Sequence, residues 1–412
     1  MNLDEVILEK IKKCRIYGIN NPKVIRNIIK IPDYINIKKL DKIIDSFYDN
    51  FYILKGSAKP KLTVSQLHEK YLSIEKSNSI RLSSVPINAN KSDYRRISVV
   101  NKDWLKESQK KLNKILVKTL LYRESDKSPL KSVVPYLHSS VKKRSFNTNA
   151  KAHIGNKYVL ALDLKDFYPS VSKMKIYSFF KNEMNLSPDA AMIYTVISTV
   201  KNEKGEYCLG QGLPQSTTLA FLTNYHLFNY ICYYALELGI KMSVYVDDII
   251  FSSENEIPQE FINRLFGLIK KNKMLIKREK VHRYNNISTK KLTGVYIRGN
   301  CATVPCFKYN EIYIQYSELK KNILKIRNFD EYFEAYNLYL KFYGNYQFIY
   351  EVEKRIKKIY RQFVEEYDSY FPKGIHKKDK SLNYKKNNIK NITDMYKLNS
   401  CYQRLLNKTI SI

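Results

Sequence analysis

Two adjacent aspartates interrupt a run of residues that otherwise has the composition of a buried β-strand. The run covers residues 242–252 and reads MSVYVDDIIFS, with β-branched and aromatic residues on both sides of Asp247 and Asp248. This pattern predicts a strand, a tight turn that carries the two carboxylates, and a returning strand. Uncompensated charge beside a sheet is costly, so a bound divalent cation is the expected compensation. An ordinary aspartate-rich hairpin turn is the alternative interpretation.

A third aspartate lies at the end of another predicted strand. Residues 158–162 read YVLAL and lead directly into Asp163, which is followed by an aromatic pair and a proline turn. Neighbouring strands lie about 4.8 Å apart, so Asp163 can meet Asp247 and Asp248 if the strands pair. Three carboxylates at that spacing suit two hard divalent cations about 3.5–4 Å apart, the arrangement that drives phosphoryl transfer.

With these acids, further motifs make the chain resemble a reverse transcriptase. Asp163 resembles the first catalytic acid of the palm, and residues 245–248 (YVDD) resemble its Tyr-x-Asp-Asp hairpin. Residues 210–219 (GQGLPQSTTL) resemble the segment that contacts the incoming nucleotide and the template, and residues 94–97 (YRRI) resemble the fingers motif that grips the triphosphate. The resemblance implies an α+β right-hand polymerase fold, with fingers, a palm of antiparallel sheet backed by helices, and a helical thumb.

Two shorter elements narrow the resemblance to bacterial retron-type reverse transcriptases. Residues 149–153 (NAKAH) are similar to an Asn-Ala-x-x-His element ahead of the first palm strand, and residues 292–294 (LTG) are similar to a Val-Thr-Gly element. The resemblance implies that Asn149, His153, Thr293 and Gly294 bind RNA. A hydrogen-bonded loop histidine is the alternative interpretation of His153.

One position departs from the family pattern. The family usually has glycine after Leu-Pro-Gln, whereas here Gln215 is followed by Ser216. A Cβ where the backbone passes close to the nascent base pair is expected to change template handling. This departure, with about ninety residues ahead of the fingers motif, makes the related reverse transcriptases linked to phage defence an equally good match.

The resemblance also implies how the catalytic residues act. Asp163, Asp247 and Asp248 would hold two Mg²⁺ ions, with Mn²⁺ as an alternative and Asp248 in a weaker or outer role, while a deoxynucleotide is transferred to a primer hydroxyl. Lys280 would protonate the leaving pyrophosphate, although an ordinary surface lysine is an equal alternative.

Three further residues are expected to bind the nucleotide. Arg95 would pair with the triphosphate in a bidentate manner. The ring of Tyr168 would lie against the sugar and exclude a 2′-hydroxyl. Gln215 belongs to the Leu-Pro-Gln segment that contacts the nucleotide.

The chain carries a large excess of basic residues. Lysine and arginine number 72 against 39 acidic residues among 412, which gives a formal net charge of +33. This excess predicts a nucleic-acid partner, although lysine-rich codon bias is an alternative explanation. We expect an RNA template or non-coding RNA, the DNA product and dNTPs as partners, and leave open an effector protein.

Other features of the sequence bear on location. No stretch approaches the roughly 18 apolar residues that a membrane span requires. The six cysteines form no Cys-x-x-Cys pair, and the start of the chain is acidic. We therefore expect reduced thiols, a cytoplasmic location and no membrane partner.

Four regions are predicted from these patterns. They are a helical N-terminal extension, a fingers and palm region, a helical thumb and a basic tail: residues 1–85, 86–300, 301–372 and 373–412. A fingers helix is predicted from a leucine period at residues 105–120, and a single buried palm helix over residues 219–238. Residues 395–406 are predicted to dock as a terminal helix.

The predicted function is RNA-directed DNA synthesis by a retron-type or defence-associated enzyme with a role in antiviral defence. A polymerase of the same fold that needs no template, or that uses a protein primer, remains open because of residues 215–218 and the 35 tyrosines. A non-catalytic RNA-binding scaffold is disfavoured, because all three acids are present.

Overall fold

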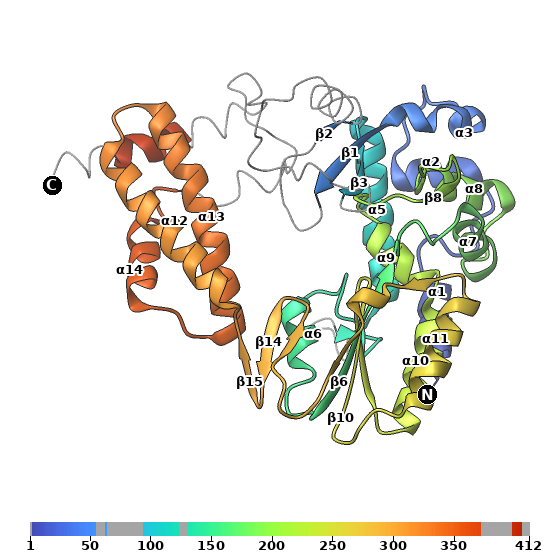
Figure 1. Cartoon of the computed structure of the whole chain (residues 1–412). Helices are drawn as coiled ribbons and strands as arrows, with labels where there is room; N and C mark the ends of the chain where they lie inside the picture. Colours follow the sequence, from blue (N-terminus) through green and yellow to red (C-terminus); the bar gives the residue numbers. More distant parts are fainter. Residues whose placement is uncertain (1, 55–61, 64–93, 123–130, 372–397, 406–412) are drawn as a thin grey trace, which may run out of the picture. The chain divides into compact units, whose positions relative to one another are not determined.

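A computed structural model describes residues 2–54, 62–63, 94–122, 131–371 and 398–405 (Figure 1). The chain divides into two compact units, Met1–Ile287 and Ser288–Ile412. Within the described residues, no helix combines the length and the apolar character that crossing a bilayer requires.

An antiparallel sheet lies at the centre of the first unit. Its strand order is β11-β6-β10-β9, and β12 also pairs with β6. The bounds are β6 (Tyr158–Lys165), β9 (Lys241–Tyr245), β10 (Asp248–Ser253), β11 (Leu275–Ile276) and β12 (His282–Tyr284). The outer edge of β9 is covered by a loop, since Val244 N donates to Tyr136 O and His138 N donates to Val244 O, both at 2.8 Å. This cover leaves β9 no open edge there for another strand.

The helices α10 (Tyr225–Glu237) and α11 (Gln259–Lys271) pack with this sheet, and α9 (Ser216–Leu222), which precedes α10, contacts the helix over Asp103–Thr119. The single helix predicted over residues 219–238 is therefore two helices. The break occurs because the Asn224 side chain donates to Ala220 O at 2.8 Å, while its backbone N–H turns to Phe221 O at 2.9 Å. A side chain that donates a hydrogen bond to a helix carbonyl competes with the backbone hydrogen bonds of the helix.

A small sheet and one long helix lie around the start of the region predicted to form the fingers. β1 (Tyr48–Leu54) pairs antiparallel with β3 (Tyr94–Val100) and with β2 (Leu62–Thr63). The N-terminal extension predicted to be helical, residues 1–85, thus also supplies two strands, β1 and β2. α5 (Asp103–Thr119) is the predicted fingers helix, and it buries the leucine face read from the sequence: Leu105, Leu112, Leu116 and, just past its end, Leu120.

Shorter elements complete the first unit. The helices are α1 (Leu3–Lys12), α2 (Pro22–Ile29), α3 (Leu40–Ile43), α6 (Phe146–Lys151), α7 (Lys173–Ser178) and α8 (Pro188–Val196). Two hairpins are β4 (Leu121–Tyr122) with β5 (Lys131–Ser132), and β7 (Thr199–Lys201) with β8 (Tyr207–Leu209). α1 contacts α10, where Asn229 Nδ2 donates to Asp4 Oδ1 at 2.6 Å.

The second unit is a small sheet followed by helices. The sheet joins β13 (Lys290–Leu292), β14 (Val295–Arg298) and β15 (Cys301–Thr303); the helices are α12 (Cys306–Lys325), α13 (Phe329–Glu353), α14 (Lys358–Tyr367) and a helix at residues 398–405. Its core is aromatic, with Phe371 against Tyr332 and Tyr339 at centroid distances of 5.7 and 4.8 Å. Leu398 and Leu405 are fully buried, so the described part of the predicted terminal helix does dock.

Candidate active site

The pairing of β6 with β10 brings the predicted carboxylates together. Asp163 lies directly opposite Asp248 in the antiparallel register. β10 also pairs with β9, where Asp248 lies opposite Tyr245, so Val246 and Asp247 form a two-residue turn. The strand, turn and returning strand predicted from the sequence are all present, and one end of the sheet presents three aspartates.

The turn has an unusual backbone. Val246 has φ = 59°, a left-handed value that is rare for a β-branched residue. A positive φ at the first central position is typical of a type II′ turn, where glycine is usual. The turn is tied to β6, because Leu164 N donates to Asp247 O at 2.9 Å. Strain of this kind persists only where surrounding contacts impose it, and it clusters at functional sites.

Two lysines neutralise Asp163. Lys280 Nζ lies 2.6 Å from Asp163 Oδ2, and Lys277 pairs with the other carboxylate oxygen. Lys277 N also donates to Asp163 O at 2.9 Å, so the backbone fixes its position. Lys280 was expected from the sequence at this site and Lys277 was not. The only sequence signal for Lys277 was its place three residues before Lys280.

The carboxylate cluster is electrostatically unfavourable without added positive charge. Burial, followed by the charges of Asp247 and Asp163, raises the pKa of Asp248 to about 7, against a partial lowering by Lys280 and Lys277. A carboxylate cluster of this kind fits hard divalent cations, which prefer oxygen ligands.

The three aspartates do not form a complete set of metal ligands in this structure. Among the described residues, no three His, Cys, Asp or Glu side chains are gathered as a metal site. Both oxygens of Asp163 are engaged by lysines. Each carboxylate oxygen has two lone pairs, so a metal ion at Asp163 would either share these oxygens with Lys277 and Lys280 or displace one of the lysines.

The Leu-Pro-Gln segment packs against the fingers. Gly212 has φ = 103°, and a Cβ there would come within 2.7 Å of Ile97 Cγ2 and 3.0 Å of Ser98 O. Ser98 N donates to Gln211 O at 2.9 Å. Only glycine suits this close approach, which joins the segment to β3.

Gln215 and Ser216 differ from expectation. Gln215 is fully buried, and its amide donates to Ile197 O at 3.4 Å, so it is placed to hold the segment rather than to face a nucleotide. Ser216 is also buried, and its hydroxyl donates to Gly210 O. The Ser216 side chain points into the fold, so the expected change in template handling through its Cβ has no basis in this arrangement.

Tyr168 and Arg95 both precede this segment in the sequence. Tyr168 is half-buried, and its hydroxyl is 3.0 Å from Thr217 Oγ1, so the turn after β6 contacts the start of α9. The backbone of Arg95 pairs with Ile53 in β1; its side chain lies outside the described residues.

Comparison with known proteins identifies the family. The family model "Reverse transcriptase (RNA-dependent DNA polymerase)" matches residues 74–309, which is more than half of the chain and contains every motif discussed above. The chain belongs to the reverse transcriptase family. This family comprises polymerases that depend on divalent metal ions.

Relatives show which branch of the family this reverse transcriptase belongs to. It is 28% identical over 275 residues to the retron Se72 reverse transcriptase of Salmonella heidelberg, covering 64% of this chain and 67% of that one. It is 29% identical over 179 residues to the retron Ec86 reverse transcriptase of Escherichia coli, covering 43% of this chain and 54% of that one. The chain is thus a bacterial retron-type reverse transcriptase, in the enzyme class of RNA-directed DNA polymerases.

A solved structure shows a weaker likeness. The apo telomerase of Candida tropicalis, truncated from its C-terminal domain, is 13% identical to this reverse transcriptase. The match covers 62% of this chain and 63% of that one, with a TM-score of 0.36.

The asparagine and histidine of the Asn-Ala-x-x-His element, residues 149–153, are buried in the fold of this reverse transcriptase. His153 is fully buried, and its two ring nitrogens lie 2.6 Å from Ser252 Oγ and Ser243 Oγ. Those serines belong to β10 and β9, so His153 joins the two strands of the hairpin that carries Asp247 and Asp248. Asn149 is fully buried too, and within the described structure its side-chain amide makes no hydrogen bond. Neither side chain is exposed to RNA, which argues against the predicted direct contact.

The environment of His153 predicts a pH dependence of stability. Burial, followed by the charges of Lys241 and His138, lowers the pKa of His153 to about 3 from 6.5. Between these values the unfolded chain binds the proton and the folded chain does not. Stability should therefore fall as the pH drops from 6.5 toward 3, by up to about 1.4 kcal/mol per pH unit.

This is measured by urea unfolding at pH 7 and pH 5 for the wild type and His153→Gln. The variant should be less stable at pH 7 and should lose about 2 kcal/mol less than the wild type on acidification. His282→Gln, at an exposed histidine, is the matched control. Equal pH dependence in the wild type and His153→Gln would contradict the buried, neutral role.

Thr293 and Gly294 form the turn between β13 and β14. Leu292 lies opposite Val295, and the two turn residues have φ values of 44° and 86°. Two positive φ values are typical of a type I′ hairpin turn, which favours glycine at its second position. This accounts for Gly294 through the backbone, and RNA binding by the pair stays a prediction.

Proposed function

We propose that this chain copies a dedicated non-coding RNA into DNA with two Mg²⁺ ions, as part of an antiviral defence system. The observation that carries the catalytic proposal is the register that sets Asp163 opposite Asp248, with Asp247 in the adjoining turn. Three carboxylates at one end of a sheet suit the binding of paired divalent ions, and the family chemistry supplies the reaction.

Each part of the site has a proposed role in nucleotide transfer. Asp163 and Asp247 would hold the metal ions, and Asp248 would support them. Bound divalent ions would activate the primer hydroxyl and stabilise charge on the phosphates. Arg95 would pair with the triphosphate. Lys280, at the edge of the carboxylate cluster, would act as the proton donor to pyrophosphate.

The proposal is tested by primer extension. Purified protein is supplied with a homopolymer RNA template, a DNA primer, the complementary dNTP and Mg²⁺ or Mn²⁺. Incorporation that needs the template supports RNA-directed synthesis. Equal incorporation without a template would support terminal extension instead, and no incorporation with either ion would favour a scaffold role.

Tyr168 is proposed to select deoxynucleotides. Tyr168→Ala should raise ribonucleotide incorporation relative to deoxynucleotide, because removing the ring opens space for the 2′-hydroxyl. The ratio is measured by competition between the two triphosphates on one primed template. Tyr168→Phe keeps the ring and loses the hydroxyl contact with Thr217, so it should keep the wild-type ratio. If Tyr168→Ala also keeps that ratio, the ring serves only in packing.

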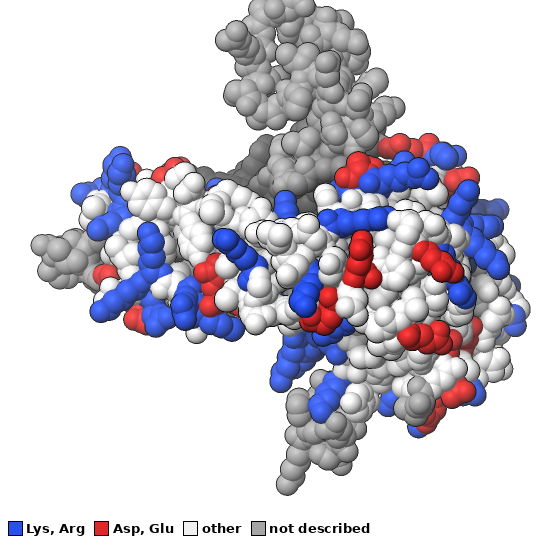
Figure 2. Space-filling model, turned by 60° about the horizontal axis from the view of Figure 1, so that its bottom comes forward, with Lys and Arg blue, Asp and Glu red and all other residues white. Residues whose placement is uncertain are grey.

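The excess of basic residues predicts a strong salt dependence of RNA binding. Lysine and arginine side chains are scattered over the face shown in Figure 2, with acidic groups between them. Binding releases counterions, so log affinity should fall linearly with log salt concentration, by roughly 0.7–0.9 per phosphate contact. Fluorescence anisotropy across a salt series measures this slope. A slope near zero would point to codon bias as the source of the lysines.

The biological setting is a further part of the proposal. A retron-type enzyme would associate with its own RNA and DNA product, and an effector protein would be a further partner in the cytoplasm. Purification from the native host, followed by sequencing of bound nucleic acid, tests this directly. A single recurrent RNA covalently or stably joined to DNA would support it, and a random transcript mixture would argue against a dedicated RNA.

A further inference from the structure

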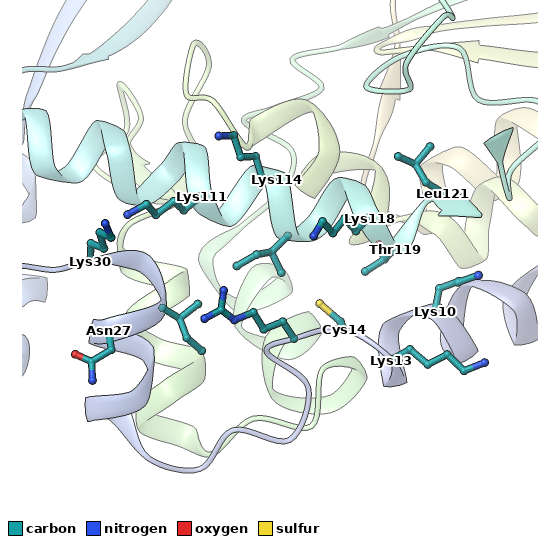
Figure 3. A pocket seen from close by; sticks show the side chains of 13 residues that line it. Lys10, Lys13, Cys14, Asn27, Lys30, Lys111, Lys114, Lys118, Thr119 and Leu121 are labelled. Atoms are coloured by element: carbon teal, nitrogen blue, oxygen red, sulfur yellow. The ribbon is translucent and has the colours of Figure 1, made fainter. Parts of the chain in front are cut away.

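A basic pocket lies between α1, α2 and α5 of the first unit (Figure 3). Its volume is about 620 Å³. The described residues that line it include seven cations and no acid, and the cations are Lys10, Lys13, Arg15, Lys30, Lys111, Lys114 and Lys118. The cations come from separate segments of the chain, so the fold gathers them at one place.

The face of α5 that lines this pocket is turned away from the Leu-Pro-Gln segment, residues 210–219. Lys111, Lys114 and Lys118 recur at the three- and four-residue spacing that places side chains on one helix face. Asn113 lies about half a turn away from them, and its Oδ1 accepts from Thr218 of α9 at 2.8 Å. α5 therefore separates the pocket from the Leu-Pro-Gln segment, and the two belong to different sites.

The positive charge in the pocket is poorly compensated. Within the described part of the chain, Lys13 pairs with Glu9, and no ion pair is found for the other six cations. Lys30 and Lys111 point toward each other in Figure 3. Partial burial, followed by the charge of Lys30, lowers the pKa of Lys111, against an opposing effect of Glu107. Clustered like charges of this kind are relieved by a bound anion.

Helix ends do not account for the whole cluster. Lysines in the last turn of a helix interact favourably with its dipole, which explains Lys10 in α1 and Lys118 in α5. Lys111 and Lys114 lie within α5, where the dipole gives no such benefit. Lys30 is the C-cap residue of α2, with φ = 59°, so the helix dipole favours its charge too. Lys111 and Lys114 require another explanation.

We infer that this pocket binds closely spaced phosphate groups of an RNA backbone, at a second site separate from the carboxylate centre. The choice of RNA as the source of the phosphates rests on the proposed function. Cations from α1, α5, the α1–α2 loop and the residue that follows α2 match several phosphates better than one, and lysine binds phosphate as a point charge. RNA held here would anchor the partner RNA without competing with the template strand.

The test compares two triple variants of the full chain. Lys30→Gln/Lys111→Gln/Lys118→Gln removes three pocket charges, and Lys204→Gln/Lys270→Gln/Lys271→Gln removes three exposed lysines that do not line the pocket. The probe is a labelled RNA hairpin, with binding followed by anisotropy over a salt series. The pocket variant should bind the RNA at least about tenfold more weakly at low salt. The magnitude of its slope of log affinity against log salt concentration should fall by roughly two to three. The control variant should change both values little.

Cys14 gives a local readout, because it lines the pocket and is partly exposed. Hairpin RNA should slow alkylation of Cys14 in the wild type and not in the pocket variant, as followed by mass spectrometry. Melting temperatures of both variants should match the wild type, because the replaced side chains are largely exposed. A Lys30→Arg/Lys111→Arg variant keeps the charge and should keep RNA binding.

The outcomes separate this inference from the proposed function. Equal RNA binding by the two triple variants, or no protection of Cys14 by RNA, would overturn the inference even if primer extension succeeds. Protection of Cys14 by tripolyphosphate but not by RNA would mean that the pocket binds a small free polyanion and not an RNA backbone. Loss of primer extension in the wild type, with RNA binding at the pocket intact, would contradict the proposed polymerase activity alone.

Discussion

Asp247→Asn should reduce DNA synthesis at least about a hundredfold, because it removes a metal-binding carboxylate at almost constant side-chain volume. The backbone of Asp247 accepts from Leu164 N, and the substitution leaves that contact in place. Fold and RNA binding should therefore be nearly unchanged. Primer extension with Mg²⁺, RNA anisotropy and thermal unfolding measure the three properties on one preparation.

Asp166→Asn is the matched control for this substitution. Asp166 lies in the turn after β6, its side chain is exposed, and its φ is 48°. Asparagine tolerates that left-handed conformation, so the control makes the same chemical change without strain or loss of a predicted metal ligand. It should keep near-normal synthesis. Should Asp247→Asn retain even a tenth of wild-type incorporation, its assignment as a metal ligand is wrong.

Asp163→Asn should cause a similar loss of synthesis, and the Asp163→Asn/Asp247→Asn double variant should be no worse than either single variant. Residues that act as one catalytic unit have strongly non-additive effects on rate. Single-turnover rates of the three variants measure this. Losses that multiply in the double variant would mean that the two aspartates act independently.

Stability should distinguish the two single variants. Asp163 is largely buried and pairs with both Lys277 and Lys280, whereas Asp247 lies in a turn. Removing one member of a buried ion pair leaves its partner uncompensated, at a cost on the order of 3 kcal/mol. Asp163→Asn should therefore melt at a lower temperature than Asp247→Asn. Assays below both melting temperatures keep this effect apart from the catalytic loss.

The end of the sheet that carries the three aspartates could be predicted because its signal is local. The β-branched and aromatic residues before Asp163 and on both sides of Asp247 favour strands that meet at a turn, and the spacing of strands lets the aspartates converge once those strands pair. The leucine period of α5 was equally readable, since all of those leucines face one side. In both places the hydrophobic pattern alone determines the direction of the side chains.

Other features depend on contacts between distant segments. Lys277 reaches Asp163 only because a short turn returns the chain to β6. From the sequence, His153 is indistinguishable from a loop residue. In the structure, serines from two separate strands contact both of its ring nitrogens. The helix break at Asn224 could not be predicted, because no glycine or proline lies there. Residues that are both polar and buried are those for which a hydrophobic pattern carries no information.

The left-handed backbone at Val246 matters for any effort to make this enzyme more heat-resistant. A screen that scored melting temperature alone would favour glycine there, since relief of the left-handed conformation is worth roughly 1–2 kcal/mol. The same replacement would loosen the turn that aims Asp247, because glycine lets the backbone sample several conformations. Gains in durability at this position would therefore come with slower turnover, and selection for both traits together should leave Val246 unchanged.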